Sequence, residues 1–397
     1  MQPSHPAAAR LDLIDALRGF AIVSIMLLHN IEHFDLYFSP QGLPAWLKAL
    51  DGVAWDSAFF LFGGKSYAIF ALLFGLTFHL QYHAREQRGE DFRPRFAWRM
   101  VLLLGFGLLN SMFYHGDILS IYAVLGLVLI PVARLPNRVT LALAGLLLLQ
   151  PGAWLELAAA LPQPAAKLPD PASWAYFGRA NEYLAHGSAA QVWWGNLTNG
   201  KAGVLRWSWE NGRLFQIPAL FMLGMLAGRT GRFVESAANL RFWRRALGIA
   251  ALLFVPLWLA KGQLSGWFAA EGLRRPLDVM LSSWSNLALM VILVSGFTLL
   301  YQGGAGSRVL GMLRPLGRMS LTSYVSQSVI GTSIYYGFGL GLYRYTDTLT
   351  CLAIGTGLAL LQGRFSAWWL ARHPQGPLEA LWHRATWFTP LRSRAYR

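Results

Sequence analysis

Long apolar runs, each long enough to cross a lipid bilayer, are the feature that most constrains what this chain can form. A membrane-spanning helix needs roughly 20 mostly apolar residues. Of the 397 residues, 55% are hydrophobic and 13% are charged, whereas about 25% are charged in a soluble domain. The sequence therefore predicts an all-α integral membrane protein, a polytopic bundle that forms a single transmembrane domain over residues 1–397. About ten runs qualify as spans by length, near residues 13–31, 56–80, 97–113, 117–134, 139–161, 211–229, 244–262, 279–301, 319–340 and 348–370.

Arginines in the connections between these runs predict how the chain is oriented. Every second connection is rich in Arg, as in residues 85–99, 229–245 and 308–318. Cytoplasmic loops carry an excess of Lys and Arg, so about ten spans place both termini in the cytoplasm. The same rule explains the net charge of +15, and no nucleic-acid partner is expected.

The longest connection, about residues 162–210, lies on the side that is poorer in Arg. It begins with a Pro-rich turn, "LPQPAAKLPDPASW", and continues with a segment rich in Trp and Tyr. Both aromatic residues favour the interface between membrane and water. We therefore expect an outer-face cap of short interfacial helices, on a bundle whose surroundings are membrane lipids.

The first run, "LDLIDALRGFAIVSIMLLHN", carries ionisable residues on one face. Arg18 and His29 are eleven residues apart, which is close to three full helical turns and about 16 Å along the axis. Asp12 and Asp15 precede Arg18 at intervals of three residues and continue the same stripe. Because ionisable residues within a membrane face a bundle interior or a wet cavity, this face predicts a functional site. The alternative is a structural Asp–Arg ion pair, with His29 at the outer interface.

The outer end of this run reads "HNIEH", the inverse of a zinc-protease pattern. On a continuous helix, His29 and His33 would share a face, as two metal ligands must, and Glu32 could act as a base. A zinc site needs a third ligand, and no acidic motif downstream supplies one. We therefore expect no metal, and we assign Asn30, Glu32 and His33 to a cavity at the outer end.

Lys65 lies deep in the second run, within "LFGGKSYAIF", where a charge is costly. We expect an acidic partner for it among Asp12, Asp15 and Asp117. Asp117 could instead cap the helix that follows it, since Asp favours helix N-termini. Gln327 lies in the polar run "SLTSYVSQS", whose Ser and Thr residues could equally serve close helix packing. The remaining residues that we assign to the cavity are Asn110 and Tyr122.

The spacing from Arg18 to His29, within "LRGFAIVSIMLLH", resembles the first-helix motif of membrane acyltransferases of the acyltransferase-three type. In that family the His is the essential catalytic residue. The rest of the chain resembles the YeiB-like family, domain of unknown function 418, through segments such as "RLDLIDALRGFAI", "FMLGMLAGR" and "GPLEALWHRATW". These segments run in the family's order from residue 10 to 388. The family is distantly similar to transmembrane acyltransferases, including the heparan-glucosaminide acetyltransferase type.

This resemblance implies an enzyme of the bacterial inner membrane that moves an acyl group, expected to be acetyl, from cytoplasmic acyl-CoA. The acceptor would be a hydroxyl of an envelope glycan or of a lipid-linked compound at the outer face. His29 would act as the base or carry the acyl group, since imidazole, with an ordinary pKa near 6.5, can take up a hydroxyl proton. Arg18 would orient the donor or pair with Asp15. The cations that would meet the phosphates of acyl-CoA are Arg18, Lys65, Arg95 and Arg99.

Two other classes of function stay open on the sequence alone. A transporter or flippase of a lipid or small molecule would also need polar residues within the membrane, without acyl chemistry. Many transporters contain inverted repeats, and we see none in this sequence. The other class is a non-catalytic binding or sensory subunit, which would gain weight if His29 could be replaced without loss. The positive-inside rule alone also accounts for the arginines without any ligand.

Overall fold

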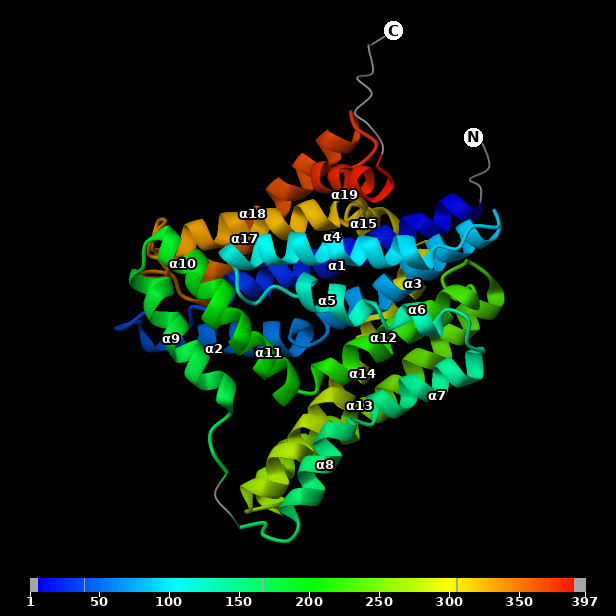
Figure 1. Cartoon of the computed structure of the whole chain (residues 1–397). Coiled ribbons are helices and arrows are strands. Elements are labelled where there is room, and N and C mark those ends of the chain that lie inside the picture. Colours follow the sequence, from blue (N-terminus) through cyan, green and yellow to red (C-terminus); the bar gives the residue numbers. More distant parts are fainter. Residues whose placement is uncertain (1–5, 39, 166–167, 305, 389–397) are drawn as a thin grey trace.

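The computed structural model describes residues 6–38, 40–165, 168–304 and 306–388 (Figure 1). Every regular element in these ranges is helical, which confirms the predicted all-α fold. An apolar chain favours helices in a bilayer because a helix satisfies its own backbone hydrogen bonds. The longest helices are α1 (Pro6–Ile31), α3 (Ser66–Glu86), α4 (Arg93–Phe113), α13 (Ala237–Trp267), α14 (Glu271–Gln302) and α18 (Thr348–Leu370).

Six helical segments of the described chain are long and apolar enough to cross a membrane. They indicate a multi-pass membrane protein, as the sequence predicts. Large apolar side chains such as Val53, Leu155 and Leu252 are exposed on these segments, which suits contact with lipid. The segments are Asp12–Ile31, Ala45–Glu86, Arg93–Phe113, Asn137–Ala160, Ala237–Trp267 and Glu271–Gln302.

Helices occupy most of each of the ten predicted runs, but three of the runs are interrupted and the run 319–340 ends early, since α17 ends at Tyr335. The break before α3 includes Gly64, whose φ of +78° lies in the region that favours glycine. The break before α8 falls at Gln150, and the Pro151 that follows it cannot continue an incoming helix. Each interruption leaves backbone groups free for other partners. The interrupted pairs are α2 (Ala45–Phe62) with α3, α5 (Leu119–Gly126) with α6 (Leu129–Val132), and α7 (Asn137–Leu148) with α8 (Pro151–Ala160).

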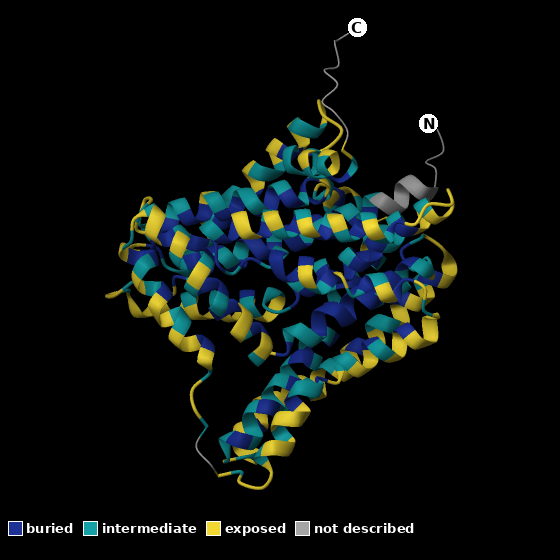
Figure 2. Cartoon of the chain, viewed as in Figure 1, coloured by how far each residue is buried: buried dark blue, intermediate teal, exposed yellow. Residues whose placement is uncertain are grey.

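The first helix, α1, is the most buried of the six segments, and Figure 2 shows that buried residues gather in the middle of the molecule. Glycines allow its neighbours to come close. A Cβ on Gly317 would clash with the carbonyl oxygen of Asp15, and a Cβ on Gly75 of α3 would clash with Phe221. The helices that pack against α1 include α3, α16 (Arg314–Arg318), α17 (Ser320–Tyr335) and α18, and α3 also packs against α12 (Arg213–Arg229).

Short helices cover the end of the bundle at which α1 ends, and they come from the connection 162–210. Leu184 and Val192 of this cap pack in one apolar cluster with Ile31 and Tyr335. At the other end of the bundle, α19 (Pro377–Trp387) packs on the first turns of α4 and α17. The cap helices are α9 (Ala172–His186), α10 (Ala189–Gly195), a π-helical turn over Asn196–Gly200 and α11 (Lys201–Glu210). The remaining short elements are α15 (Ser307–Gly311) and a 3₁₀ turn over Leu342–Arg344.

Candidate active site

Two ion pairs hold the aspartates in the first half of α1. Asp15 Oδ1 lies 2.8 Å from Arg18 Nη1, and the second guanidinium nitrogen of Arg18 donates a hydrogen bond to the hydroxyl of Thr77. Asp12 Oδ2 lies 2.6 Å from Arg314 Nη1. The Asp–Arg contact expected from the sequence is therefore present, and Arg18 is also tied to α3.

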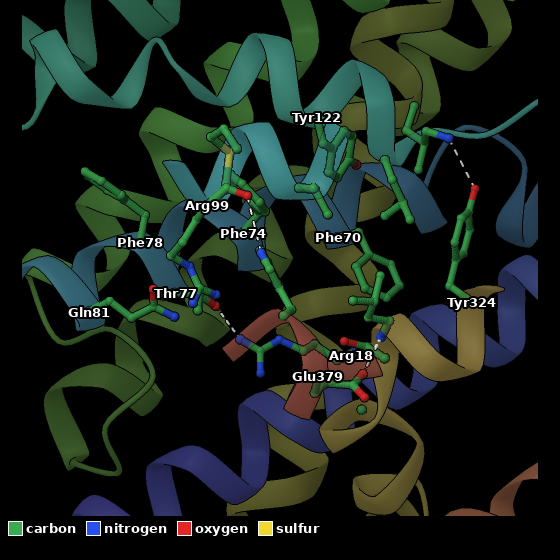
Figure 3. A pocket seen from close by; sticks show the side chains of 18 of the residues that line it. Arg18, Phe70, Phe74, Thr77, Phe78, Gln81, Arg99, Tyr122, Tyr324 and Glu379 are labelled. Carbon is green, nitrogen blue, oxygen red and sulfur yellow. Dashed lines mark hydrogen bonds between the residues drawn. The ribbon is translucent and has the colours of Figure 1, made fainter. Parts of the chain in front are cut away.

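A cavity of about 240 Å³ begins beside Arg18 (Figure 3). Along α1 its lining runs from Arg18 to Ile25, and along α3 it runs from Gln81 to Phe70. The charged side chains lie toward the Arg18 end, where Phe78 and Trp382 also lie, and the Phe70 end is lined by aromatic and apolar side chains without charge. The cationic lining residues are Arg18, Arg99 and Arg318, and the hydroxyl-bearing aromatic residues are Tyr122 and Tyr324.

The helix α19 contributes two residues to the lining of this cavity. Glu379 lines the cavity and accepts hydrogen bonds from the backbone N–H of Leu321, at 2.7 Å, and from the hydroxyl of Thr322, at 2.6 Å. Trp382 lines it as well, and its ring lies 4.1 Å from the guanidinium carbon of Arg99. Arg99, which the sequence predicts to meet the phosphates of acyl-CoA, lines this cavity, whereas Arg318, Glu379 and Trp382 were not among the predicted residues.

Two of the predicted cofactor-binding cations lie outside this cavity. Arg95 Nη1 donates to the carbonyl oxygen of Thr386, at 2.8 Å. Lys65 Nζ donates to the carbonyl oxygen of Phe59, at 3.3 Å. That carbonyl belongs to the last turn of α2, where acceptors lack helical partners and a cation is favoured. The expected acidic partner of Lys65 is therefore wrong, because the break between α2 and α3 supplies a backbone acceptor. The three aspartates considered, Asp12, Asp15 and Asp117, pair instead with Arg314, Arg18 and Lys201.

His29 lies just beyond the aromatic end of the cavity. Its ring centroid is 4.6 Å from that of Tyr114, 5.4 Å from that of Phe34 and 6.4 Å from that of Tyr324, which itself lines the cavity. Within the described chain, its buried Nδ1 has no hydrogen-bond partner, although the residue as a whole is partly exposed. An imidazole in this position keeps unused capacity to bind or move a proton.

The pairing of His29 with His33 that the zinc hypothesis requires does not occur. The first helix ends at Ile31, and His33, Phe34 and Asp35 all have positive φ, of 47°, 55° and 68°. This left-handed turn directs His33 into a separate buried cluster, where Nε2 lies 2.9 Å from Thr346 Oγ1 and 3.3 Å from Cys351 Sγ. Burial lowers the pKa of His33 to about 4. Its surroundings indicate a structural role.

Asn30 also belongs to the packing around this turn. Its Nδ2 donates to the carbonyl oxygen of Met26, at 2.7 Å, and its Oδ1 accepts from the hydroxyl of Tyr335, at 2.9 Å. Both ends of the amide are thus satisfied, so Asn30 fixes α1 against α17. In the part of the chain that the structure describes, no group of three or more His, Cys, Asp or Glu residues is arranged to hold a metal ion.

Two carboxyl groups follow His29 in the same turn. Glu32 accepts a hydrogen bond from the hydroxyl of Tyr37, at 3.0 Å, and Asp35 Oδ2 lies 3.4 Å from His115 Nε2. Burial raises the pKa of Glu32, and the nearby Asp35 carboxylate raises it further. Burial also raises the pKa of Asp35 and lowers that of His115. The arrangement can therefore hold protons at a pH where an ordinary carboxyl group is ionised.

Arg213, at the start of α12, is a cation whose charge acts on both of these carboxyl groups. Its positive charge lowers the pKa of both Glu32 and Asp35, opposing the larger effect of burial. Its guanidinium carbon lies 3.9 Å from the ring of Trp207 and 4.2 Å from the ring of Tyr67. The sequence prediction did not include Asp35 or His115 in the site. The position of Asp35 two residues after the "HNIEH" motif was the available signal for that residue.

Asp117 anchors the turn between α4 and α5. It accepts hydrogen bonds from Asn110 Nδ2 and from the backbone N–H of Ser120, both at 3.0 Å, and it lies 3.5 Å from Lys201 Nζ. The capping role that the sequence suggested is confirmed by the Ser120 contact. Among the described residues, Asn110 Oδ1 and Ser120 Oγ are buried without a hydrogen-bond partner. Tyr122, on α5, lines the cavity and donates to the carbonyl oxygen of Tyr67.

Gln327 does not take part in this site. It is buried on α17 and lines a different cavity of about 290 Å³, between α17 and α18. Within the described residues, neither its Oε1 nor its Nε2 has a hydrogen-bond partner. The predicted site thus divides into a cavity that leads from Arg18 toward His29, a turn with Glu32 and Asp35, and outlying residues that serve the fold.

Comparison with known proteins identifies relatives but no established activity. Residues 227–389 match the family described as "Protein of unknown function (DUF418)". The "Uncharacterized protein YxaH" of Bacillus subtilis (strain 168) is 27% identical, over 96% of this chain and 95% of its own. The "Uncharacterized protein YeiB" of Escherichia coli (strain K12) is 28% identical, over 94% of this chain and 95% of its own. No solved structure matches. The predicted resemblance to YeiB-like proteins is therefore confirmed: residues 227–389 match the DUF418 family, and the chain is similar to YeiB and YxaH along nearly its whole length.

Proposed function

We propose that this protein is a transmembrane acyltransferase. It would take an acyl group from cytoplasmic acyl-CoA and pass it to a hydroxyl acceptor at the outer face of a bacterial inner membrane. The observation that carries the proposal is the 240 Å³ cavity, which has arginines at one end and approaches His29 at the other. In this proposal the chain crosses the membrane about ten times, with both termini in the cytoplasm.

The cavity has the chemistry expected for one long substrate with an anionic head. Arg18, Arg99 and Arg318 line its charged end, and guanidinium groups suit phosphates because they donate in pairs. The aromatic end would accept an uncharged thioester arm. The positive-inside rule predicts arginines on this side of the membrane, but it does not require three of them to face one cavity.

His29 would act as the general base. It would take the proton of the acceptor hydroxyl while the hydroxyl oxygen attacks the thioester carbonyl carbon. As the carbon–sulfur bond breaks, the imidazolium would return the proton to the leaving sulfur, giving an ester and free CoA. Arg18, held by Asp15, would fix the donor at the far end of the cavity, about 16 Å along α1.

A second candidate, a transporter of a lipid or small molecule, is favoured by the interrupted helices. Discontinuous helices with exposed backbone groups are typical of binding sites in secondary transporters, and α2–α3 is interrupted at Gly64 and Lys65. Transport would not require proton transfer at His29. The two candidates therefore differ in what they expect from a single substitution.

The test is release of CoA from acetyl-CoA by purified protein in nanodiscs, with and without an envelope-glycan extract. We expect His29→Ala to lower the rate by about 10²–10⁴-fold, the usual contribution of a general base. His83→Ala is the matched control, because His83 lies at the end of α3 with its side chain 53% exposed, and its rate should equal that of wild type. A folded wild-type protein that neither binds acetyl-CoA nor releases CoA would overturn the proposal.

The membrane orientation has its own test. Cys351, the only cysteine in the sequence, is buried, so introduced cysteines can be labelled selectively. A membrane-impermeant maleimide applied to intact cells should label Ala190→Cys in the cap and leave Arg88→Cys, after α3, unlabelled until the cells are opened. Labelling of both positions, or of Arg88→Cys alone, would contradict the proposed orientation.

A further inference from the structure

A second cavity, of about 920 Å³, lies between the cap and the ends of α8, α13 and α14. Figure 1 shows these three helices extending together away from the rest of the bundle. The volume is near the upper end of the range for ligand pockets, about 300–1,000 Å³. The mechanism proposed above does not use this cavity, and its lining differs from that of the first.

We propose that this second cavity binds the acceptor, and that the acceptor is a neutral or cationic oligosaccharide. That the bound glycan is an acceptor rests on the proposed acyltransferase function. That the cavity binds a glycan at all rests on the cavity itself. Three features of the lining support it: its charge, its exposed indole rings and its connection to the surroundings of His29.

The lining contains more acidic than basic residues, in a protein whose net charge is +15. Five carboxylates and three cations line the cavity, a difference of two negative charges. Within the described chain, neither Glu156 nor Asp170 forms an ion pair. Carboxylates accept hydrogen bonds from hydroxyl and ammonium groups, and they repel sulfates and phosphates. The first cavity has the opposite balance, with three arginines and one glutamate.

Two tryptophans line the same cavity, Trp174 of α9 and Trp207 of α11. Trp174 is 61% exposed, so its ring is available to a ligand. A sugar ring presents C–H groups on its faces and hydroxyls at its edge. An indole face can therefore cover the C–H groups, while neighbouring carboxylates bind the hydroxyls. This combination of side chains is unsuited to a purely apolar ligand.

Trp207 also connects the cavity to the candidate active site. The guanidinium group of Arg213 is stacked between the rings of Trp207 and Tyr67, and the carbonyl oxygen of Tyr67 accepts the hydroxyl of Tyr122, which lines the first cavity. The helix α11 also links the two regions. Trp207 lies about 9 Å along this helix from Lys201, and Lys201 is the partner of Asp117. These contacts place Arg213 next to the second cavity, and the proposal has the acceptor reach His29 on this side.

The test is binding of labelled protein in nanodiscs to an array of neutral, amino and sulfated oligosaccharides. We expect neutral or amino glycans to bind and sulfated ones to fail. Trp174→Ala should weaken binding by about tenfold, as loss of an aromatic anchor does, and the double variant Glu156→Gln, Asp170→Asn should weaken it as well. Trp154→Ala is the matched control, because Trp154 is exposed on α8 and does not line the cavity.

Three results would overturn the inference: no glycan binding by folded wild-type protein, preference for sulfated glycans, or equal binding by Trp174→Ala and Trp154→Ala. CoA release into water, measured without any glycan, separates this inference from the proposed function. Glycan binding without His29-dependent CoA release would keep the site and reject the acyltransferase. CoA release that depends on His29, without glycan binding, would reject the acceptor site alone.

Discussion

The two ends of α1 differ in how their polar groups are paired. At the Arg18 end, ion pairs hold both Asp12 and Asp15. At the other end, the buried Nδ1 of His29 has no partner among the described residues, and Glu32 is bonded to a tyrosine hydroxyl rather than to a cation. Pairing within the fold holds a side chain in place, whereas an unpaired buried polar group still lacks a partner that a substrate or a proton could supply. Under the proposed function, this contrast fits positioning of the donor at the first end and proton transfer at the second.

The test with the largest expected effect concerns the Arg18 end of α1, where the aspartates are held in ion pairs. The side chains of Asp15 and Arg18 are 16% and 20% exposed, whereas those of Asp12 and Arg314 are 46% and 43% exposed. Asp15→Asn should destabilise the protein by about 1–3 kcal/mol, because it leaves Arg18 without its carboxylate in a mostly buried position. Asp12→Asn should cost at most about 1 kcal/mol, as for other exposed pairs. Denaturant unfolding in detergent measures both.

Asp12→Asn serves as the matched control for this measurement, since it removes the same charge three residues away on the same helix. Equal losses of stability in the two variants would contradict the comparison, because burial of the pair would then have no effect. A double variant in which Arg18→Gln accompanies Asp15→Asn should recover part of the loss, since no unpaired charge remains.

The second test concerns the unpaired end and the pH dependence of stability. In the folded protein the pKa of Glu32 is raised above its ordinary value of 4.5 by burial, so the folded state keeps a proton that the unfolded chain loses. Its contribution to stability is therefore complete below pH 4.5 and is lost as the pH rises through the raised pKa. Glu32→Gln, which cannot lose a proton, should have a Tm that falls less steeply over this range.

Thermal unfolding followed from pH 4.5 upward, for wild type and Glu32→Gln, checks this prediction. Tyr37→Phe is an informative companion, because it removes the hydroxyl that donates to Glu32 and keeps the carboxyl group. Identical pH profiles for wild type and Glu32→Gln would show that Glu32 titrates normally, and the carboxyl pair would lose its place in the site.

The helices were largely predictable from sequence, and their interruptions were not. Apolar runs of about 20 residues have few alternatives to helix in a bilayer, so helices occupy most of each of the ten runs. Gly64 and Gln150 hardly change the hydropathy of the runs that contain them. Their breaks depend on a positive φ and on the following Pro151, which is information about local geometry rather than about apolar length.

The site was predictable where residues share one helix and unpredictable where a turn or a distant element contributes. The spacing of Arg18 and His29 fixes their common face. The position of the His33 side chain depends on three successive residues with positive φ. Tertiary contacts must hold this backbone conformation, because it is unfavourable for residues other than glycine. Lys65 donates a hydrogen bond to a backbone carbonyl rather than to a carboxylate. Its partner could not be predicted, since ion pairing depends on which helices become neighbours. The place of Arg213 near Glu32 and Asp35 likewise depends on which helices become neighbours.

The smallest expected effect sharpens the comparison at the charged end of the first cavity. Arg99 lines the cavity with its guanidinium group over Trp382, whereas Arg88 lies exposed after the end of α3 and does not line it. Arg99→Gln should raise the KM for acetyl-CoA by about 3–10-fold, because one charge-assisted contact of roughly 1 kcal/mol is lost, and it should leave kcat nearly unchanged. Arg88→Gln removes an equal charge from the same side of the membrane and should alter neither constant. If both variants raise KM alike, long-range attraction by the basic loops accounts for donor binding, and the cavity then contributes no specific phosphate contact.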